Sequence, residues 1–294
     1  MMTTVFLLFV LYALFVSVLA LTSLPIIWVI LIPCAFLAVQ YFFSDRIALF
    51  SMGGKVVTRE QAPQLHGVVD RLCAMADMPK PQVGIAETDL PNAFATGRDR
   101  KHAVVCVTTG LLRRLDEPEL EAVLAHELSH VAHRDVAVMT IASFLGILAG
   151  MLTRVLVYAG MFGGFGDGDN RNSQGALIEI GLLVFSALVY AISFILIRAL
   201  SRYRELAADR SGAILIGQPR LLAQALVKVS GEMSRIPTRD LRAAEHFNAF
   251  FFAPAFAKGA SLSSLFSTHP SLERRLAQLT ELEAQMGHGV GGAA

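Results

Sequence analysis

Cysteine and net charge are both scarce in this sequence, and each scarcity excludes a class of protein. The 294 residues include three cysteines, Cys34, Cys73 and Cys106, and no two of them form a C-x-x-C pair. A disulfide framework is therefore not expected, and a metal site would have to use histidine and carboxylate ligands. The formal net charge is only +1, so no polyanionic partner is implied and nucleic-acid binding has no support.

Charged side chains are missing from the start of the chain, where none precedes Asp45. This apolar run is about twice the length that one membrane span requires, and Thr22-Ser23-Leu24-Pro25 interrupts it. We therefore expect two transmembrane helices in segment 1–43, at about 4–21 and 25–43. A cleavable signal peptide is the alternative for the first helix, but no basic region precedes the apolar run.

Two further stretches without charged residues lie in mid-chain, at 136–153 and 180–197. Each is close to the lower length limit for a span. With their flanks they predict a membrane hairpin at 136–199, whose helices lie at about 136–157 and 177–199. The connection at 160–175 is rich in glycine, asparagine and aspartate, which is typical of an exposed loop.

The distribution of basic residues predicts how the chain is oriented in the membrane. Basic residues follow the second and fourth predicted spans and precede the third, whereas the mid-chain loop has only Arg171. Segments 44–135 and 200–294 should therefore both be cytoplasmic. Two spans separate these segments, so they lie on the same side of the membrane and can form one domain. The basic residues are Arg46, Lys55, Arg59, Arg134, Arg198, Arg202, Arg204 and Arg210.

The most informative motif is His126-Glu127-Leu128-Ser129-His130, which matches H-E-x-x-H. Asp116-Glu117-Pro118-Glu119 precedes it and indicates a helix start with Asp116 as the N-cap and Glu119 in a capping box. On a helix, the two histidines lie one turn apart on one face and can bind one metal ion. Glu127 then faces a water on that metal, as in zinc hydrolases. Before this helix, residues 103–107 indicate a buried strand. An apolar stripe predicts another helix that begins near Ala62; its members are Leu65, Val68, Val69, Leu72 and Met75.

A catalytic zinc ion needs a third protein ligand. The metzincin pattern would require glycine at position 133 and a ligand at position 136, and the chain has His133 and Val136 there. His133 is a competing ligand, although ligands at i, i+4 and i+7 would splay along one helix. The better candidate is Glu205, which shares a helix face with Asp209 where the fourth span continues. One carboxylate would bind the metal and the other would hold a ligating histidine.

These segments together resemble a known family. The H-E-x-x-H motif with Arg202-Tyr203-Arg204-Glu205-Leu206-Ala207-Ala208-Asp209 is similar to the HtpX-type membrane metalloproteases, which are gluzincins related to the CAAX prenyl proteases. His269-Pro270-Ser271-Leu272-Glu273-Arg274-Arg275 resembles the C-terminal signature of that family, and the resemblance covers nearly the whole chain. It implies a mainly α membrane protein with four transmembrane helices and a cytoplasmic α+β gluzincin-type zinc protease domain with a small sheet.

The resemblance also implies which residues form the site. His126, His130 and Glu205 would bind one zinc ion per chain, and Glu127 would take a proton from the attacking water and pass it to the leaving amine. Asp209 would orient His126 through the nitrogen that does not bind the metal.

Other residues would complete the site. By the same resemblance, His269 would stabilise the oxyanion and Arg275 would support that pocket, the alternative for Arg275 being a charge on a helix surface. A strand would receive the substrate peptide along its open edge, the alternative being an ordinary hairpin strand. Residues 247–256, with five phenylalanines, could line a cleft, rest on lipid or fill a core. The residues assigned to the substrate strand are Asn92, Ala93, Phe94 and Ala95.

The function implied by the resemblance is zinc-dependent cleavage of peptide bonds in damaged or misassembled membrane proteins. Its partners would be peptide or protein substrates and the lipid bilayer, and its place would be a bacterial inner or archaeal membrane. The alternatives are a processing peptidase of narrow specificity, like the prenyl proteases, and a non-catalytic membrane scaffold or chaperone-like protein. The intact set of His126, Glu127, His130 and Glu205 argues against the scaffold. The sequence indicates no oligomeric state.

Overall fold

The computed structural model describes residues 2–20, 26–161, 173–235 and 269–290. The chain divides into two compact units. Unit 1 comprises Met1–Val39 and Val138–Leu200, and unit 2 comprises Gln40–Ala137 and Ser201–Ala294. Each unit therefore combines two separate stretches of the sequence, and residues 247–256, for which three roles are open, lie outside the described part.

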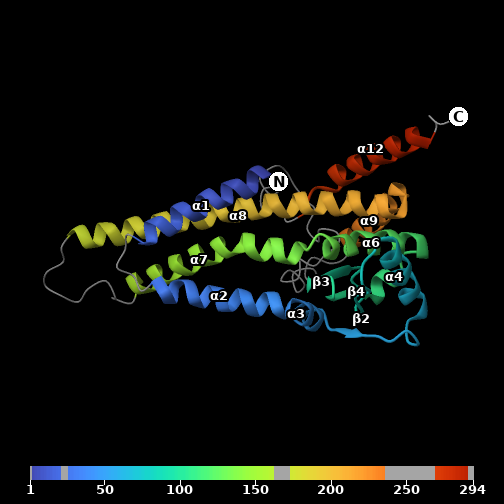
Figure 1. Ribbon diagram of the computed structural model, residues 1–294, viewed down its shortest axis with the longest axis horizontal. Helices are drawn as coiled ribbons and strands as arrows, with labels where there is room; N and C mark the ends of the chain where they lie inside the picture. Colours follow the sequence, from blue (N-terminus) through green and yellow to red (C-terminus); the bar gives the residue numbers. More distant parts are fainter. Residues whose placement is uncertain (1, 21–25, 162–172, 236–268, 291–294) are drawn as a thin grey trace. The chain divides into compact units, whose positions relative to one another are not determined.

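Unit 1 is built from long apolar helices (Figure 1). The segments Asp135–Val157 and Ile180–Ile216 are long and apolar enough to cross a membrane, and Thr3–Ser17 is a shorter apolar stretch. The second half of the predicted hairpin continues without a break past Asp209, as the sequence predicts. The turn predicted at 22–25 and most of the loop at 160–175 lie outside the described residues. The helices are α1 (Met2–Ala20), α2 (Ile26–Phe42), α7 (Asp135–Met161) and α8 (Ser173–Ile216).

Unit 2 contains a small mixed sheet with the strand order β1-β2-β4-β3. Strands β2 and β4 are parallel, whereas β1 pairs with β2 and β3 with β4 in antiparallel fashion. Strand β4 confirms the strand predicted at 103–107, and β3 lies at one end of the sheet. The strands are β1 (Gly54–Val56), β2 (Gln82–Ala86), β3 (Ala93–Asp99) and β4 (His102–Thr108).

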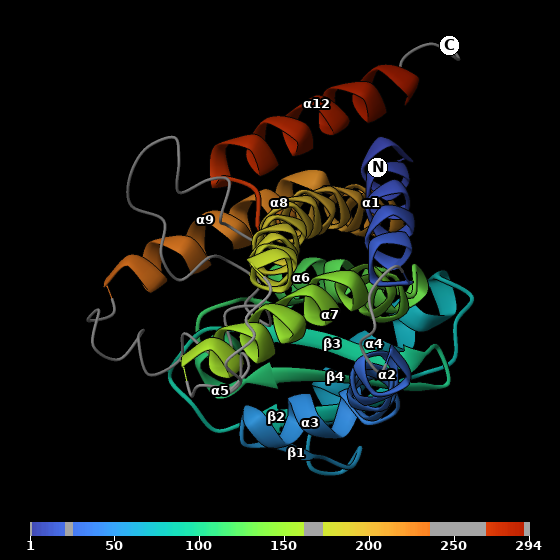
Figure 2. The ribbon, with the colours of Figure 1, turned by 90° about the vertical axis from the view of Figure 1, so that its left-hand side faces the viewer.

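The two faces of the sheet are covered by different helices (Figure 2). Successive side chains of a strand point to opposite faces, so Val105 and Val107 join the main core with α4 (Pro63–Met75) and α6 (Glu117–Ala132). Phe94 and Cys106 point the other way and form a smaller core with Ala48 of α3 (Ser44–Ser51). Helices therefore cover both faces of the sheet.

Helix α6 begins where the sequence predicts. The Asp116 carboxylate accepts a hydrogen bond from the Glu119 amide at 3.0 Å, and the Glu119 carboxylate accepts one from the Asp116 amide at 3.1 Å. This reciprocal capping box satisfies two amides that would otherwise lack partners. Lys228 also binds Glu119, at 2.6 Å. The remaining helices of unit 2 are α5 (Thr109–Leu112), α9 (Pro219–Arg235), which carries Lys228, and α12 (Leu272–Val290).

The apolar stripe predicted for α4 is correct except at its end. Leu65, Val68 and Leu72 are buried in the main core, whereas Met75 is 51% exposed. Met75 is the last residue of the helix, and Met78, three residues later, is buried in the main core instead. Helical spacing alone therefore extends the buried stripe one turn too far.

Candidate metal centre

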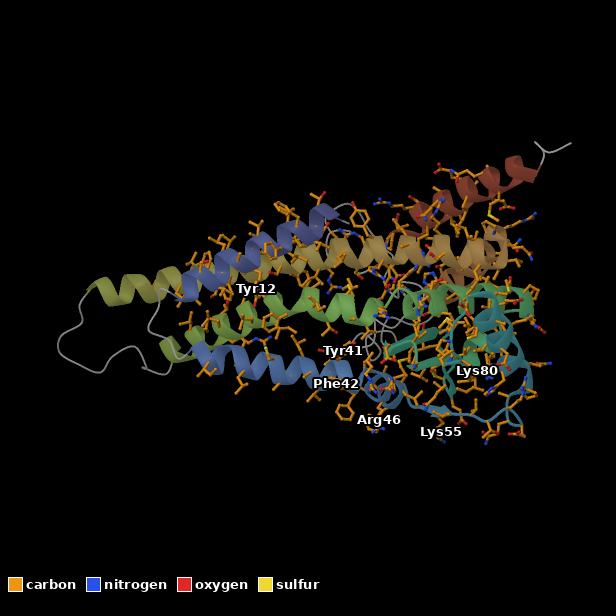
Figure 3. All side chains as sticks on the ribbon, in the orientation of Figure 1. Tyr12, Tyr41, Phe42, Arg46, Lys55 and Lys80 are labelled. Atoms are coloured by element: carbon orange, nitrogen blue, oxygen red, sulfur yellow. The ribbon has the colours of Figure 1, made fainter. Side chains whose placement is uncertain are left out.

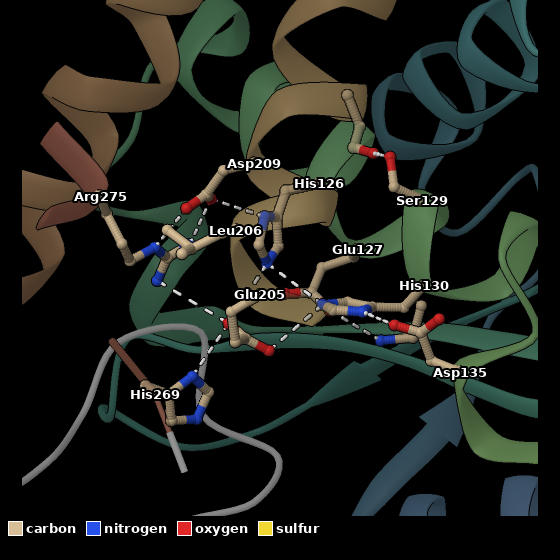
Figure 4. A network of polar contacts seen from close by, with 12 residues as sticks. His126, Glu127, Ser129, His130, Asp135, Glu205, Leu206, Asp209, His269 and Arg275 are labelled. Carbon is tan, nitrogen blue, oxygen red and sulfur yellow. Dashed lines mark hydrogen bonds and ion pairs between the residues drawn. The ribbon is translucent and has the colours of Figure 1, made fainter. Parts of the chain in front are cut away.

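The side chains of His126, His130 and Glu205 converge inside unit 2 (Figure 4). The Nε2 atoms of the two histidines lie 3.3 Å apart. Glu205 Oε1 lies 3.5 Å from Nε2 of His130, and Glu205 Oε2 lies 3.8 Å from Nε2 of His126. One ligand atom from each residue falls within 4.8 Å of the others. Possible ligands from α6 and α8 therefore meet at one point, although His130 and Glu205 are 75 residues apart in the sequence.

The hydrogen bonds of the two imidazoles define which nitrogen faces this point. Nδ1 of His126 lies 2.9 Å from Asp209 Oδ1, and Nδ1 of His130 lies 2.6 Å from Asp135 Oδ2. An ionised carboxylate can only accept a hydrogen bond, so each Nδ1 is assigned as the N–H donor and each Nε2 carries a lone pair. Burial lowers the pKa of His126, which favours the same neutral form.

A zinc ion fits this arrangement. Two lone pairs that face each other repel, and a cation between them removes the repulsion. Ligands at the usual zinc distances lie about 3.3–3.4 Å apart in a tetrahedral site, which is close to the separations among His126, His130 and Glu205. Two nitrogens and one carboxylate are also a ligand set that catalytic zinc sites use.

A buried ion pair with Arg275 holds Asp209, the hydrogen-bond partner of His126, in place. The Arg275 guanidinium contacts both oxygens of Asp209, Nε at 2.7 Å and Nη2 at 2.6 Å. Both side chains are fully buried, and loss of one partner of such a pair typically costs about 3–5 kcal/mol. Arg275 is thus not a surface charge, and its main contact is with the partner of a possible ligand.

Behind His130, the supporting carboxylate is Asp135, the first residue of α7. Asp135 pairs in turn with Arg204, the residue before Glu205. Arg204 also donates a hydrogen bond to the carbonyl of His133 at 3.3 Å. The part of α8 that carries Glu205 therefore also binds Asp135, the partner of His130. Through Arg204, it contacts the region after the motif at two points, the Asp135 carboxylate and the His133 carbonyl.

Glu127 is buried beside the two histidines and faces the sheet. Its Oε2 accepts a hydrogen bond from the main-chain amide of Ala95 in β3 at 3.1 Å. Burial raises the pKa of the Glu127 carboxyl to about 8. The carboxylate therefore stands between the possible metal ligands and the edge strand, and the positive charge of a bound ion would favour its ionised form.

The other histidines singled out in the sequence take different positions. His269 is buried, and its Nδ1 lies 2.9 Å from Glu205 Oε2. His133 is exposed at the end of α6, where its Nε2 lies 3.5 Å from the Ser211 hydroxyl. Among the described residues, the group that can share one metal contains neither of them.

Of the four residues assigned to the substrate strand, Asn92 directly precedes β3, and Ala93, Phe94 and Ala95 begin it. The Asn92 carbonyl accepts a hydrogen bond from the Thr108 amide, and the Asn92 amide donates one to the Thr108 side-chain hydroxyl, both at 2.9 Å. Alternation along a strand then turns the main-chain groups of Phe94 toward β4 as well, and those of Ala93 and Ala95 to the outer edge. Within the described ranges, no strand pairs with that edge.

Three residues at the site escaped the sequence reasoning. Asp135 and Arg204 form the support of His130 described above. Gly212 lets α8 lie directly against α6, because a Cβ there would come within 2.7 Å of the His126 amide nitrogen. Glu205, Asp209 and Gly212 follow at i, i+4 and i+7, so they share one face of α8. That spacing was visible in the sequence and is the signal that could have identified Gly212.

Comparisons with known proteins identify relatives of this chain. The chain is similar to Protease HtpX homolog 1 of Streptomyces coelicolor, with 57% identity over 97% of this chain and 92% of the relative. It is also similar to Protease HtpX homolog of Moorella thermoacetica, with 54% identity over 97% of this chain and 94% of the relative.

A solved structure shows a related fold. The crystal structure of S. mikatae Ste24p covers 92% of this chain with a TM-score of 0.53 and 16% sequence identity. This chain spans 61% of the length of that protein, and at this identity the likeness concerns the fold alone. Residues 59–283, which include every residue of the candidate centre, match peptidase family M48, a family that implies a metal, usually zinc. The chain therefore belongs to peptidase family M48, as a metallopeptidase of the HtpX type.

Proposed function

We propose that this chain is a membrane-embedded zinc endopeptidase in which His126, His130 and Glu205 hold one zinc ion. The observation that carries the proposal is the convergence of two Nε2 atoms and one carboxylate in a buried site. Each imidazole has its Nδ1 on a separate carboxylate, which leaves both Nε2 atoms ready to bind a cation. A bound zinc ion would supply Lewis-acid chemistry, lowering the pKa of a water and polarising the scissile carbonyl.

Glu127 is the proposed general base. Its carboxylate takes a proton from the attacking water and later delivers that proton to the leaving amine. The 3.1 Å hydrogen bond from the Ala95 amide to Oε2 fixes the direction of the carboxylate, so Oε1 is the oxygen that is available for the proton. Such proton transfers contribute about 10²- to 10⁴-fold to a rate.

The remaining residues are proposed to position the ligands and the reacting carbonyl. Asp209 orients His126, and Arg275 holds Asp209 through two contacts. His269 is proposed to donate a hydrogen bond to the oxyanion. Its support is a buried place next to Glu205, so a carbonyl oxygen near the metal would also be near this ring. The support that Arg275 gives to an oxyanion pocket would be indirect, through Asp209 and the neighbouring Glu205.

The outer edge of β3 is proposed to receive the substrate peptide as an additional strand. A peptide would pair with the main chain at Ala93 and Ala95, because the main chains of Asn92 and Phe94 face β4. The edge amide of Ala95 contacts Glu127, so a peptide bound there would lie next to the general base. Main-chain pairing depends little on sequence, which suits the cleavage of many different substrates.

The proposed membrane arrangement has four spans, with residues 44–135 and 200–294 as one cytoplasmic protease domain. Its support is the basic residues near the span ends and the grouping of 40–137 with 201–294 in one compact unit. The proposed place is a cell inner membrane, and the proposed substrates are misfolded or damaged membrane proteins. A protease whose domain is interrupted by a membrane hairpin is well suited to substrates that are themselves anchored in the bilayer.

Metal content tests the proposal most directly. The full chain, purified in detergent, should contain about one zinc ion and cleave an unfolded protein such as casein, since the three ligands form one tetrahedral site with an open position. A chelator should remove both zinc and cleavage, and added zinc should restore both. A chain that cleaves casein equally well after its metal has been removed would contradict the proposal.

A second prediction concerns Asp135, whose carboxylate contacts Nδ1 of His130. In Asp135→Asn the amide no longer draws the Nδ1 proton of His130, so zinc affinity should fall about 10- to 100-fold. Competition with a chromophoric chelator measures this affinity without relying on activity. Asp89→Asn is the matched control, because Asp89 is 91% exposed and pairs with Arg113 on the surface. Equal zinc affinities for the two variants would show that Asp135 does not position the ligand.

A further inference from the structure

Helix α3 carries large apolar side chains on its outer face. The face that turns inward packs through Ala48 and Leu49 against the sheet. On the opposite side, Phe43 and Ile47 are each 44% exposed and Phe50 is 88% exposed. Phe43 is the N-cap residue of α3. It is followed by Ile47 and Phe50 at steps of four and three residues, which places the three side chains on one side of the helix. We call them, together with the exposed Arg46, the α3 outer face.

This pattern is the reverse of what a water-exposed helix shows. A helix that packs one face on a core normally presents polar residues on the other. Here the outer face has three large apolar side chains and one arginine. The last residue of α2, Phe42, is also an exposed apolar side chain, at 53%. Exposed large apolar side chains gathered in this way mark an interaction surface.

Basic groups surround the α3 outer face. The Arg46 guanidinium lies 5.8 Å from the centre of the Phe43 ring. Arg98 lies 5.9 Å from the Phe42 ring and donates to the Phe42 carbonyl at 3.4 Å. Lys55 is exposed in β1, and Figure 3 labels Phe42, Arg46 and Lys55 along one side of the unit. Aromatic rings with cations beside them suit a layer that is apolar on one side and phosphate-rich on the other.

The acidic groups near this surface do not cancel its charge. Asp45 lies in the first turn of α3 and is partly buried. Asp99 contacts His102 at 2.8 Å and Arg98 at 3.7 Å, so it has partners within its own hairpin. In contrast, Arg46 on the α3 outer face and Lys55 in the neighbouring strand β1 are both exposed, so this side of the unit favours an anionic partner.

We propose that the α3 outer face lies in the headgroup layer of the membrane and binds anionic phospholipid. Phe43, Ile47 and Phe50 would enter the boundary of the acyl chains, and Arg46 would contact lipid phosphate. Helix α3 follows α2 after one residue and is about 12 Å long at 1.5 Å per residue. Phe50 is thus within reach of the end of α2. The proposal rests on the part of the proposed function in which α2 spans the membrane.

Site-specific labels in lipid nanodiscs test this placement. Cys73 and Cys106 are buried and their thiol pKa values are raised by burial to about 11 and 12, so a thiol-directed fluorophore should label Cys34 alone in the wild-type chain. That label reports on α2. In a Cys34→Ser background, Phe50→Cys reports on the α3 outer face. Met75→Cys is the matched control, because Met75 is an exposed apolar residue elsewhere in unit 2.

The expected result is a difference between the two introduced labels. A nitroxide placed near the headgroup end of the lipid chains should quench the label at position 50 several-fold more than the label at position 75. Aqueous iodide should give the opposite order. The label at Cys34 should be quenched by a nitroxide deep in the acyl chains, which tests the span itself. If the Phe50→Cys chain does not retain zinc, Ile47→Cys takes its place.

Other outcomes overturn the proposal. Equal lipid quenching at positions 50 and 75 would place α3 in water. A label at position 50 that neither lipid nitroxide nor iodide reaches would show that protein covers this face. Lipid quenching at position 50 that appears only when a nanodisc holds a single copy of the chain, and is lost when it holds two, would indicate that a second copy covers this face instead. Zinc content and casein cleavage of each labelled sample separate a failure of this placement from a failure of the peptidase proposal.

The charge of the lipid supplies the last arm of the test. Quenching at position 50 should rise several-fold when phosphatidylglycerol replaces phosphatidylcholine in the nanodisc, because the basic rim attracts anionic headgroups. Adding Arg46→Glu should remove most of this rise and leave zinc content unchanged. A rise that persists in full with Arg46→Glu would show that Arg46 does not contact the lipid phosphate.

Discussion

Replacing Glu127 with glutamine should leave zinc bound and reduce peptide cleavage by about 10²- to 10⁴-fold. Glutamine has nearly the same shape and can still accept the hydrogen bond that the Ala95 amide donates. It cannot take a proton from water, so only the chemical step is lost. Metal analysis of the purified chain in detergent and the initial rate of casein cleavage measure the two effects separately.

The matched control for this substitution is Glu117→Gln. Glu117 lies on the same helix, is 58% exposed and contacts Arg71 on the surface, so its loss should change neither zinc content nor rate. If Glu127→Gln cleaves casein as fast as wild type, Glu127 is not the general base. If it loses zinc as well as activity, Glu127 supports the metal site, and the assignment of a purely chemical role is wrong.

Removal of Glu205 should have an even larger effect on the metal. Glu205→Ala leaves two histidines as the whole protein ligand set, and zinc affinity should fall more than the roughly 100-fold upper range seen for loss of a supporting residue. His133→Ala should change zinc affinity little, because His133 is exposed and stands outside the convergent group. Chelator competition on the full-length variants gives both affinities.

Folding must be separated from ligand loss in this comparison. Alanine at position 205 removes the carboxylate that lies 2.9 Å from buried His269, which can destabilise the chain. Glu205→Gln keeps the size of the side chain and removes its charge, so it should weaken zinc binding with less effect on the thermal midpoint. Tight zinc binding by Glu205→Gln together with loss of zinc in His133→Ala would move the third ligand onto the motif helix.

Local signals in the sequence predicted local structure well. The start of α6 follows from Asp116 and Glu119, whose side chains and amides are three residues apart, and no distant residue is needed to form the box. The buried strand around Val105 follows from an unbroken apolar run. Met75 shows the limit of the same reasoning, since helical spacing does not say where the core ends.

The sequence predicted the arrangement of the site only for residues that share one face of a single helix. Glu205 and Asp209 are four residues apart, so their common direction could be predicted, and the structure brings them to the H-E-x-x-H motif. Asp135 follows the end of α6 and reaches His130 only because the chain turns at Arg134, whose φ is +56°. Pattern alone does not specify such a turn, nor the partner of Arg275, which comes from a helix 66 residues away.

The order in which the chain is synthesised has a consequence for the cell that makes it. His126 and His130 leave the ribosome before the hairpin, Glu205 and Asp209 leave after it, and Arg275 emerges near the end. At ordinary translation rates these events are separated by several seconds. The growing chain therefore cannot present its full set of site residues until both halves of the hairpin have been made. A chain with this order cannot complete its candidate metal centre, and so cannot cleave peptide bonds through it, before α8 has been synthesised.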